Sequence, residues 1–107
     1  MTGQSAWTLE ALGARPLTVN RVVALHRMQW ATHTRQTRAL WTHLAREVPE
    51  LTAASFDVTP LHKDFRSPQD VAACAPEAKA AIDGIVDAGV LPDDSPTFLH
   101  SVTFYAP

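Results

Sequence analysis

Cysteine and glycine are scarce in this chain of 107 residues, and both shortages exclude classes of function. Cys74 is the only cysteine, so the chain cannot form an internal disulfide, and a reducing, intracellular setting is expected. The five histidines are scattered and show no zinc-ligand spacing. Only four glycines are present, which leaves little room for a phosphate-cradling loop or a dinucleotide-binding fingerprint.

Long apolar runs are missing too. No stretch approaches the roughly 20 apolar residues that a helix needs to span a bilayer. The N-terminus lacks the basic start and apolar core of a secretion signal. We therefore expect a cytoplasmic protein without a membrane partner. Its length and its 46% hydrophobic content predict a single folded domain over residues 1–107, in which residues 1–14 are loosely ordered.

Charge is present but unevenly distributed. Residues 1–46 contain six arginines and one acid, whereas residues 47–107 contain three basic residues and ten acids. The whole chain has a net charge of -2. This asymmetry favours a basic binding surface joined to an acidic site. Chance unevenness in a small domain is the alternative, and composition alone leaves both open.

The first half of the chain predicts a short strand and a long helix. Residues 15–20 suit a strand, and residues 28–48 have helical periodicity that ends before Pro49. The predicted buried face of this helix consists of Trp30, Thr37, Leu40, Trp41, Leu44 and Val48. The opposite, solvent-facing side consists of Arg35, Arg38, Thr42 and Arg46. These arginines form either a solvated surface or a ridge that contacts phosphates.

The second half predicts a strand, a helix and a strand. Residues 54–59 alternate between apolar and polar, residues 60–73 read as a loop, and a helix begins near Pro76 and ends before Gly89. Residues 98–105 suit a last strand. The buried helix stripe is predicted to be Ala78, Ala81, Ile82, Ile85 and Val86. The expected fold is α+β, a small mixed sheet packed by two helices.

Loop carboxylates suggest a metal site. Asp70 precedes the second helix, and Asp93 and Asp94 follow it, in positions where hard oxygen ligands can gather around Mg²⁺. The helix is about 20 Å long, so convergence of Asp70 and Asp94 requires the loop to fold back or a second subunit to contribute. The alternative for Asp93 and Asp94 is a plain turn after Pro92.

Charged residues on the helix between these loops have two readings as well. Lys79 either neutralises a phosphate or pairs with Asp83 at i,i+4 spacing. Asp83 and Asp87, taken singly, are assigned to the solvated surface of the helix.

Three segments resemble the RusA-type Holliday-junction resolvases, especially the small versions found in phages and prophages. They are PLTVN at residues 16–20, the loop ending in Asp70, and KAAIDGIVDAGVLPDD at residues 79–94. The resemblance implies a RusA-like fold and a homodimeric endodeoxyribonuclease that nicks four-way junctions and other branched DNA. It implies Mg²⁺ as the cofactor, with Mn²⁺ as a substitute. It also implies that the protein works in the cytoplasm of a bacterium or a phage-infected host.

Site residues follow from the same resemblance. It implies Asp70, Lys79 and Asp94 as catalytic residues and Asp70, Asp93 and Asp94 as metal ligands. Asn20 matches a family asparagine to which no role is assigned. The residues expected to face DNA are Arg35, Arg38, Arg46, Lys63, Arg66 and Lys79.

One departure from the family pattern keeps other functions open. Better-known members place two aspartates one residue apart in the loop, followed by asparagine, whereas Asp70 is followed here by Val71 and Ala72. Fewer ligands predict weaker metal binding. The main alternative is a catalytically weak or inactive RusA-like module that binds DNA or a protein. A further alternative is a small phage protein that inhibits a host factor through its acidic half.

Overall fold

The computed structural model describes residues 5–11, 27–60 and 74–106. Four elements follow one another in these ranges: α2 (Arg27–Leu44), β1 (Ala54–Val58), α3 (Ala75–Asp87) and β2 (Leu99–Phe104). Two helices and a two-stranded sheet confirm the general α+β class. The strand predicted at residues 15–20, with Asn20, lies outside the described residues, so the mixed character of the sheet stays a prediction.

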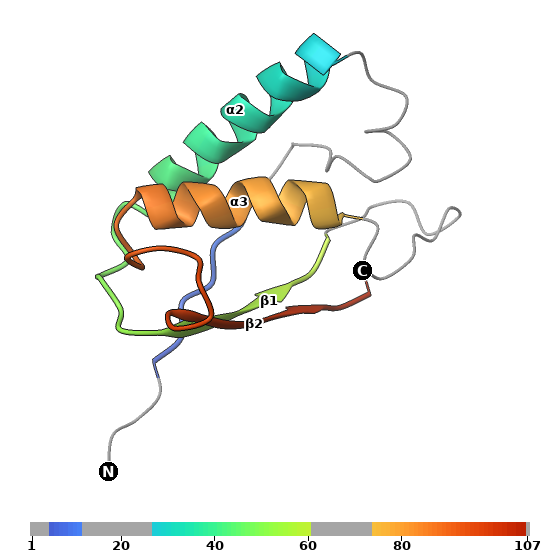
Figure 1. Cartoon of the computed structure of the whole chain (residues 1–107). Coiled ribbons are helices and arrows are strands. Elements are labelled where there is room, and N and C mark those ends of the chain that lie inside the picture. Colours follow the sequence, from blue (N-terminus) through green and yellow to red (C-terminus); the bar gives the residue numbers. More distant parts are fainter. Residues whose placement is uncertain (1–4, 12–26, 61–73, 107) are drawn as a thin grey trace.

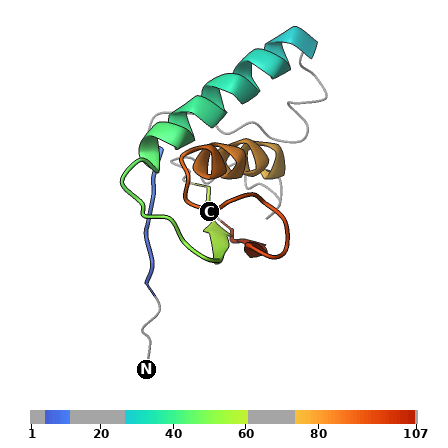
Figure 2. The ribbon, with the colours of Figure 1, turned by 60° about the vertical axis from the view of Figure 1, so that its left-hand side comes forward.

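The elements are stacked with α3 in the middle. Figures 1 and 2 show α2 on one side of α3 and the sheet on the other. β1 and β2 are parallel and pair from Ala54–Leu99 to Val58–Phe104, with an irregularity between Ala54 and Ser55. Parallel neighbours cannot be joined by a tight hairpin, so a crossover must connect them. Helix α3 is that crossover.

β1 confirms the alternation in its sequence. Ala54, Phe56 and Val58 are half-buried, whereas Ser55 and Asp57 are exposed. Successive side chains of a strand point to opposite faces, so one face of the sheet is covered and the other meets solvent.

α3 is built mainly from small residues and is mostly buried. Pro76 lies in the first turn, as predicted, where its missing N–H costs no helical hydrogen bond. Of the predicted stripe, Val86 is only half-buried, and the buried residues of the helix are Ala78, Ala80, Ala81, Ile82, Gly84 and Ile85. After the helix, Gly89 has a φ of 90°, a left-handed conformation that glycine adopts without steric cost.

Gly84 is the point of closest approach between α2 and α3. A Cβ on Gly84 would lie only 2.3 Å from the carbonyl oxygen of Arg38 and 3.0 Å from Cβ of Trp41. The Thr42 hydroxyl lies 2.9 Å from both the Gly84 and the Arg38 carbonyl oxygens, so its single proton is shared between two acceptors. Because glycine has no side chain, the backbones of α2 and α3 can pack closely against each other at Gly84.

The predicted buried face of α2 was wrong in its first half. Trp30 is 45% exposed and Leu40 is 38% exposed. Thr37 is the buried residue within α2, Trp41 and Leu44 are half-buried, and Ala45 just beyond the helix is fully buried. The reason is geometric, because α2 rises away from α3 toward its N-terminal end (Figures 1 and 2). Periodicity gives the face of a helix but not how far a neighbour extends along it.

Arg38 is exposed, as predicted, but it is paired, and Thr42 on the same predicted face is half-buried. Arg38 makes a two-pronged ion pair with Asp87, and Thr42 binds the backbone of Gly84. Arg38 follows the buried Thr37, so it flanks the contact and its long side chain reaches across to α3. The assignment of Asp87 to the solvated surface changes with it, since Asp87 joins the two helices.

α2 is also shorter than predicted. The α-helix ends at Leu44, and the chain then tightens into hydrogen bonds to residues three positions earlier. The amide of Arg46 donates to His43, and the amide of Val48 donates to Ala45. Such tightening is common in the last turn of a helix, which explains why the sequence pattern ran to residue 48.

The core lies where the C-terminal ends of the two helices meet the sheet. Its fully buried cluster is Ala45, Ile85, Val90 and Leu91, against which Trp41, Phe56 and Phe98 also pack. The amide of Leu51 donates to the Val90 carbonyl at 2.7 Å, which ties the approach to β1 to the segment after α3. No helix among residues 27–60 and 74–106 is long and apolar enough to cross a membrane.

Candidate functional site

Lys79 on α3 is the centre of a small charged cluster. Its Nζ lies 2.9 Å from Oδ1 of Asp83 and 2.6 Å from Oδ2 of Asp94. Asp83 is one turn further along the same helix, whereas Asp94 belongs to the segment that follows it. The chain after α3 therefore turns back along the helix, so that residues 15 apart in sequence meet.

Two buried residues hold this returning segment in place. Val90 and Leu91 are each only 2% exposed and belong to the core cluster. They anchor the chain directly before Pro92, so the polar residues that follow are confined to the surface beside α3. Asp93 contributes to the turn itself, because its Oδ1 accepts a hydrogen bond from the Ser95 amide at 2.7 Å. The position of Asp94 thus depends on apolar burial three residues earlier.

Hydrogen bonding shifts the pKa values of two members of the cluster. The hydrogen bond from Lys79 lowers the pKa of Asp94, and the same bond, together with that to Asp83, raises the pKa of Lys79. All three side chains retain solvent contact, so these interactions are screened and add little to stability. The two shifts favour the charged forms of Lys79 and Asp94.

The donor chemistry fits a divalent cation, but the described part of the site is incomplete. Asp83 and Asp94 carry oxygens no more than roughly 5.5 Å apart, since each is within hydrogen-bond distance of the same nitrogen. Carboxylate oxygens are the protein ligands that Mg²⁺ prefers. Among residues 5–11, 27–60 and 74–106, no three acids, histidines or cysteines form a metal-binding group. The expected ligand Asp70 lies outside the described residues.

The sequence pattern grouped Lys79, Asp93 and Asp94 in one site but left out Asp83. Lys79 and Asp94 meet, whereas Asp93 directs one oxygen into its own turn. Asp83 was assigned to the solvated surface but binds the same ammonium as Asp94. The signal for Asp83 was its i,i+4 spacing from Lys79, which was recognised as a helix pair but not as part of a site.

The structure describes three of the arginines expected to face DNA, and two of them bind other groups of the protein. Arg38 is held by Asp87, and Arg46 folds back onto the ring and carbonyl of its neighbour His43. Arg35 contacts only Thr32, at 3.3 Å. Lys63 and Arg66 lie outside the described residues.

A second polar group lies between α2 and the start of α3. Nε2 of His33 is 2.8 Å from Oε2 of Glu77, and the Thr37 hydroxyl donates to Oε1 of Glu77 at 3.3 Å. His33 itself is half-buried. These contacts join the helices at the end away from the Arg38–Asp87 pair.

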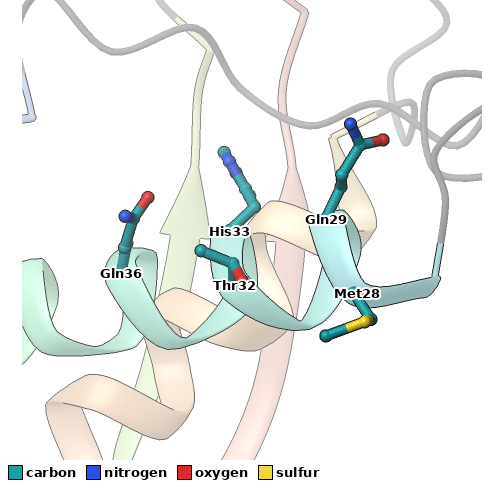
Figure 3. Close-up of a pocket in the computed structure, with 5 residues that line it drawn as sticks. All are labelled: Met28, Gln29, Thr32, His33 and Gln36. Atoms are coloured by element: carbon teal, nitrogen blue, oxygen red, sulfur yellow. The ribbon is translucent and has the colours of Figure 1, made fainter.

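His33 also borders a hollow on α2. The hollow is lined by Met28, Gln29, Thr32, His33 and Gln36 (Figure 3). Figure 3 shows Gln29, His33 and Gln36 projecting from the same side of α2, with Met28 on the other side. Cys74, before α3, is buried, and burial raises the pKa of its thiol. A protonated thiol is a poor nucleophile.

Comparison with known proteins adds no assignment: no protein-family model, curated protein or solved structure matches this chain. The charged cluster around Lys79 is therefore interpreted from its own geometry and from the motif at residues 79–94.

Proposed function

We propose that the protein is a RusA-type, Mg²⁺-dependent endodeoxyribonuclease that cuts four-way junctions and other branched DNA as a homodimer. The contact between Lys79 and Asp94 carries the proposal. The resemblance implies a functional lysine on the helix and a functional aspartate in the turn after it. The 2.6 Å contact between Nζ and Oδ2 is what a joint role of these two residues requires.

In this proposal Asp70, Asp93 and Asp94 hold the metal, with Asp83 close enough to support it. A bound Mg²⁺ polarises a phosphoryl oxygen and lowers the pKa of an attacking water. Asp94 is suited to this task because its lowered pKa keeps it ionised at neutral pH. Asp70 is separated from Cys74, the residue before α3, by only three residues in the sequence.

Lys79 has a separate role toward the substrate. An ammonium has three N–H donors, and Asp83 and Asp94 take two of them. The third is available to a phosphate oxygen, where it stabilises negative charge that develops during hydrolysis. The raised pKa of Lys79 keeps it cationic throughout the neutral range. Asp83 then acts as a positioning residue that orients the ammonium.

The decisive experiment compares Asp94 with Asp87, since each of them forms an ion pair that is exposed to solvent. We expect Asp94→Asn to reduce Mg²⁺-dependent cleavage of a synthetic four-way junction at least a hundredfold, because a ligand and the partner of Lys79 are lost together. Asp87→Asn is the matched control, since it removes the same charge from an ion pair that does not involve Lys79. Cleavage by Asp94→Asn at the rate of Asp87→Asn would eliminate the proposed site.

The non-catalytic module remains the second candidate, favoured by one observation in the sequence. Asp70 is followed by Val71 and Ala72, so one of the two loop aspartates of better-known family members is missing. This candidate predicts that the wild-type protein binds junctions but does not nick them in Mg²⁺ or Mn²⁺. In that case Ala72→Asp is the informative variant, because restoring the carboxylate should restore cleavage if the rest of the site is intact.

A further inference from the structure

The N-terminal half of α2 has an unusual charge pattern. The 18-residue helix contains three arginines and no acid. Arg38, in its second half, is neutralised by Asp87. Arg27 and Arg35, in its first half, contact no carboxylate in the described part of the chain, and the only hydrogen bond described for Arg35 goes to Thr32. The outer half of α2 is therefore a cationic surface without its own counter-charge.

A tryptophan lies between these two arginines. Trp30 is 45% exposed, and it lines a shallow hollow together with Arg27, Ala31, Thr34 and Arg35. These five positions follow the spacing that places residues on one face of a helix. Figures 1 and 2 show that α2 rises away from α3 toward its N-terminal end, where the contact of His33 with Glu77 still joins the two helices. An indole beside two guanidinium groups that have no carboxylate partner among the described residues matches an occupant that is both aromatic and anionic.

We propose that this face of α2 binds an unpaired DNA strand, with Trp30 stacked on a base and Arg27 and Arg35 on the phosphates to either side. A single strand offers exposed base faces together with phosphates, whereas a duplex hides its base faces. Arg27 and Arg35 are about 12 Å apart along the helix axis, from the usual rise per residue. That separation lets one guanidinium precede the stacked base and the other follow it.

This inference deepens the proposed function, on which it rests for the assumption that the substrate is DNA. Branched DNA with a single-stranded arm or flap exposes unpaired bases, whereas a fully paired four-way junction does not, so a stacking residue would direct the protein to branches that carry a single strand. It also separates Arg35, which belongs to the proposed surface, from Arg38, which is occupied by Asp87.

The first test measures binding without metal, so that cleavage plays no part. A fluorescent oligothymidine is titrated with the wild-type protein and with Trp30→Ala, and binding is followed by anisotropy. Because base stacking on an aromatic side chain is lost, we expect about tenfold weaker binding for Trp30→Ala. Tyr105→Ala is the matched control, since Tyr105 is 48% exposed but follows β2, away from α2. Trp30→Phe should restore most of the binding.

The second test addresses the arginines. We expect the double variant Arg27→Ala, Arg35→Ala to lower the slope of log K against log salt by about 1.4, since each phosphate contact on a single strand contributes about 0.7. Arg38→Ala, whose guanidinium is already paired, should leave the slope unchanged. In a Trp7→Phe background, where Trp30 is the remaining tryptophan with high exposure, oligothymidine should quench the fluorescence.

The outcomes distinguish this proposal from the proposed function. Binding that is equal in folded Trp30→Ala and wild type, with folding checked by circular dichroism, would overturn the stacking surface while leaving the nuclease untouched. Oligothymidine binding that depends on Trp30, in a protein that never cuts DNA, would support the surface and reject the nuclease. Concentration-dependent self-association that Trp30→Ala abolishes, without any effect on oligothymidine binding, would show that a second copy covers this face instead.

Discussion

The two helices of this protein are buried to very different extents, although both show helical periodicity in the sequence. α3 has 13 residues and buries six of them, whereas α2 has 18 residues and buries one. The more buried helix has the smaller side chains, since α3 is rich in alanine whereas α2 carries two tryptophans. Small residues let α3 fit between α2 and the sheet (Figure 1), whereas Trp30 on α2 is 45% exposed.

The difference in burial matches a difference in what each helix contributes. The inner helix supplies the core and positions Lys79, while the outer helix presents arginines and Trp30. The charges follow the same division, since the acids of the described chain are concentrated on and after β1 and none lies on α2. A basic surface joined to an acidic site was one reading of the uneven sequence charge, and the placement of these residues agrees with it. The following predictions test the contrast between the helices.

The strongest expected effect is truncation of the core on α3. Ile85 is 6% exposed and belongs to the central cluster, so Ile85→Ala should lower the free energy of unfolding by about 3 kcal/mol. The matched control is Leu40→Ala on α2, where the side chain is 38% exposed and the loss should be below about 1 kcal/mol. Urea denaturation of both variants measures the difference. Equal losses would mean that the two helices are buried alike.

An intermediate effect is expected where the helices cross. Gly84→Ala places a Cβ against the Arg38 carbonyl, which is backbone and cannot move as a side chain would. Overpacking of this kind costs about 1–3 kcal/mol, against a gain of up to about 1 kcal/mol from the helix preference of alanine. We expect a net loss of about 1–2 kcal/mol in chemical denaturation. A stabilised variant would show that α2 and α3 are further apart than described.

The smallest expected effect is electrostatic and depends on pH. The Arg38 guanidinium lowers the pKa of Asp87 below its ordinary value of 3.8. The contribution of this pair to stability is therefore fully present above that value and is lost as the pH falls through the lower pKa of the folded state. Both groups are exposed, so the contribution is small. Melting temperatures of wild type and Asp87→Asn should differ slightly at pH 7 and converge as the pH falls well below 3.8.

The strands, the inner helix and its caps could be predicted from sequence because local chemistry decides them. Pro76 begins α3, Gly89 follows its end, and the alternation from Ala54 to Val58 gives β1 its covered face. The lysine and the turn aspartate of the candidate site could be named in advance because the motif keeps them in order. The local sequence pattern was sufficient to predict an element wherever neighbouring elements cover it along its whole length.

The remaining features could not be predicted because they depend on tertiary contacts. The periodicity of α2 gives no information on where α3 stops covering it, so Trp30 was placed inside. Arg38 and Thr42 seemed solvated because their partners, Asp87 and Gly84, lie more than 40 residues away in sequence. Asp83 was separated from the site because its second neighbour, Asp94, reaches Lys79 only after the chain has turned back along α3.

The parallel pairing of β1 and β2 also constrains how the protein folds. Ala54 pairs with Leu99, so the sheet cannot close until the whole of α3 and the returning segment have been made and positioned. Contacts between residues so distant in sequence slow folding, because the entropy of closing the intervening loop is lost before the contact forms. During synthesis β1 therefore waits with an unpaired edge until β2 has emerged. Pairing of β1 with β2 is therefore expected to follow the formation of α3.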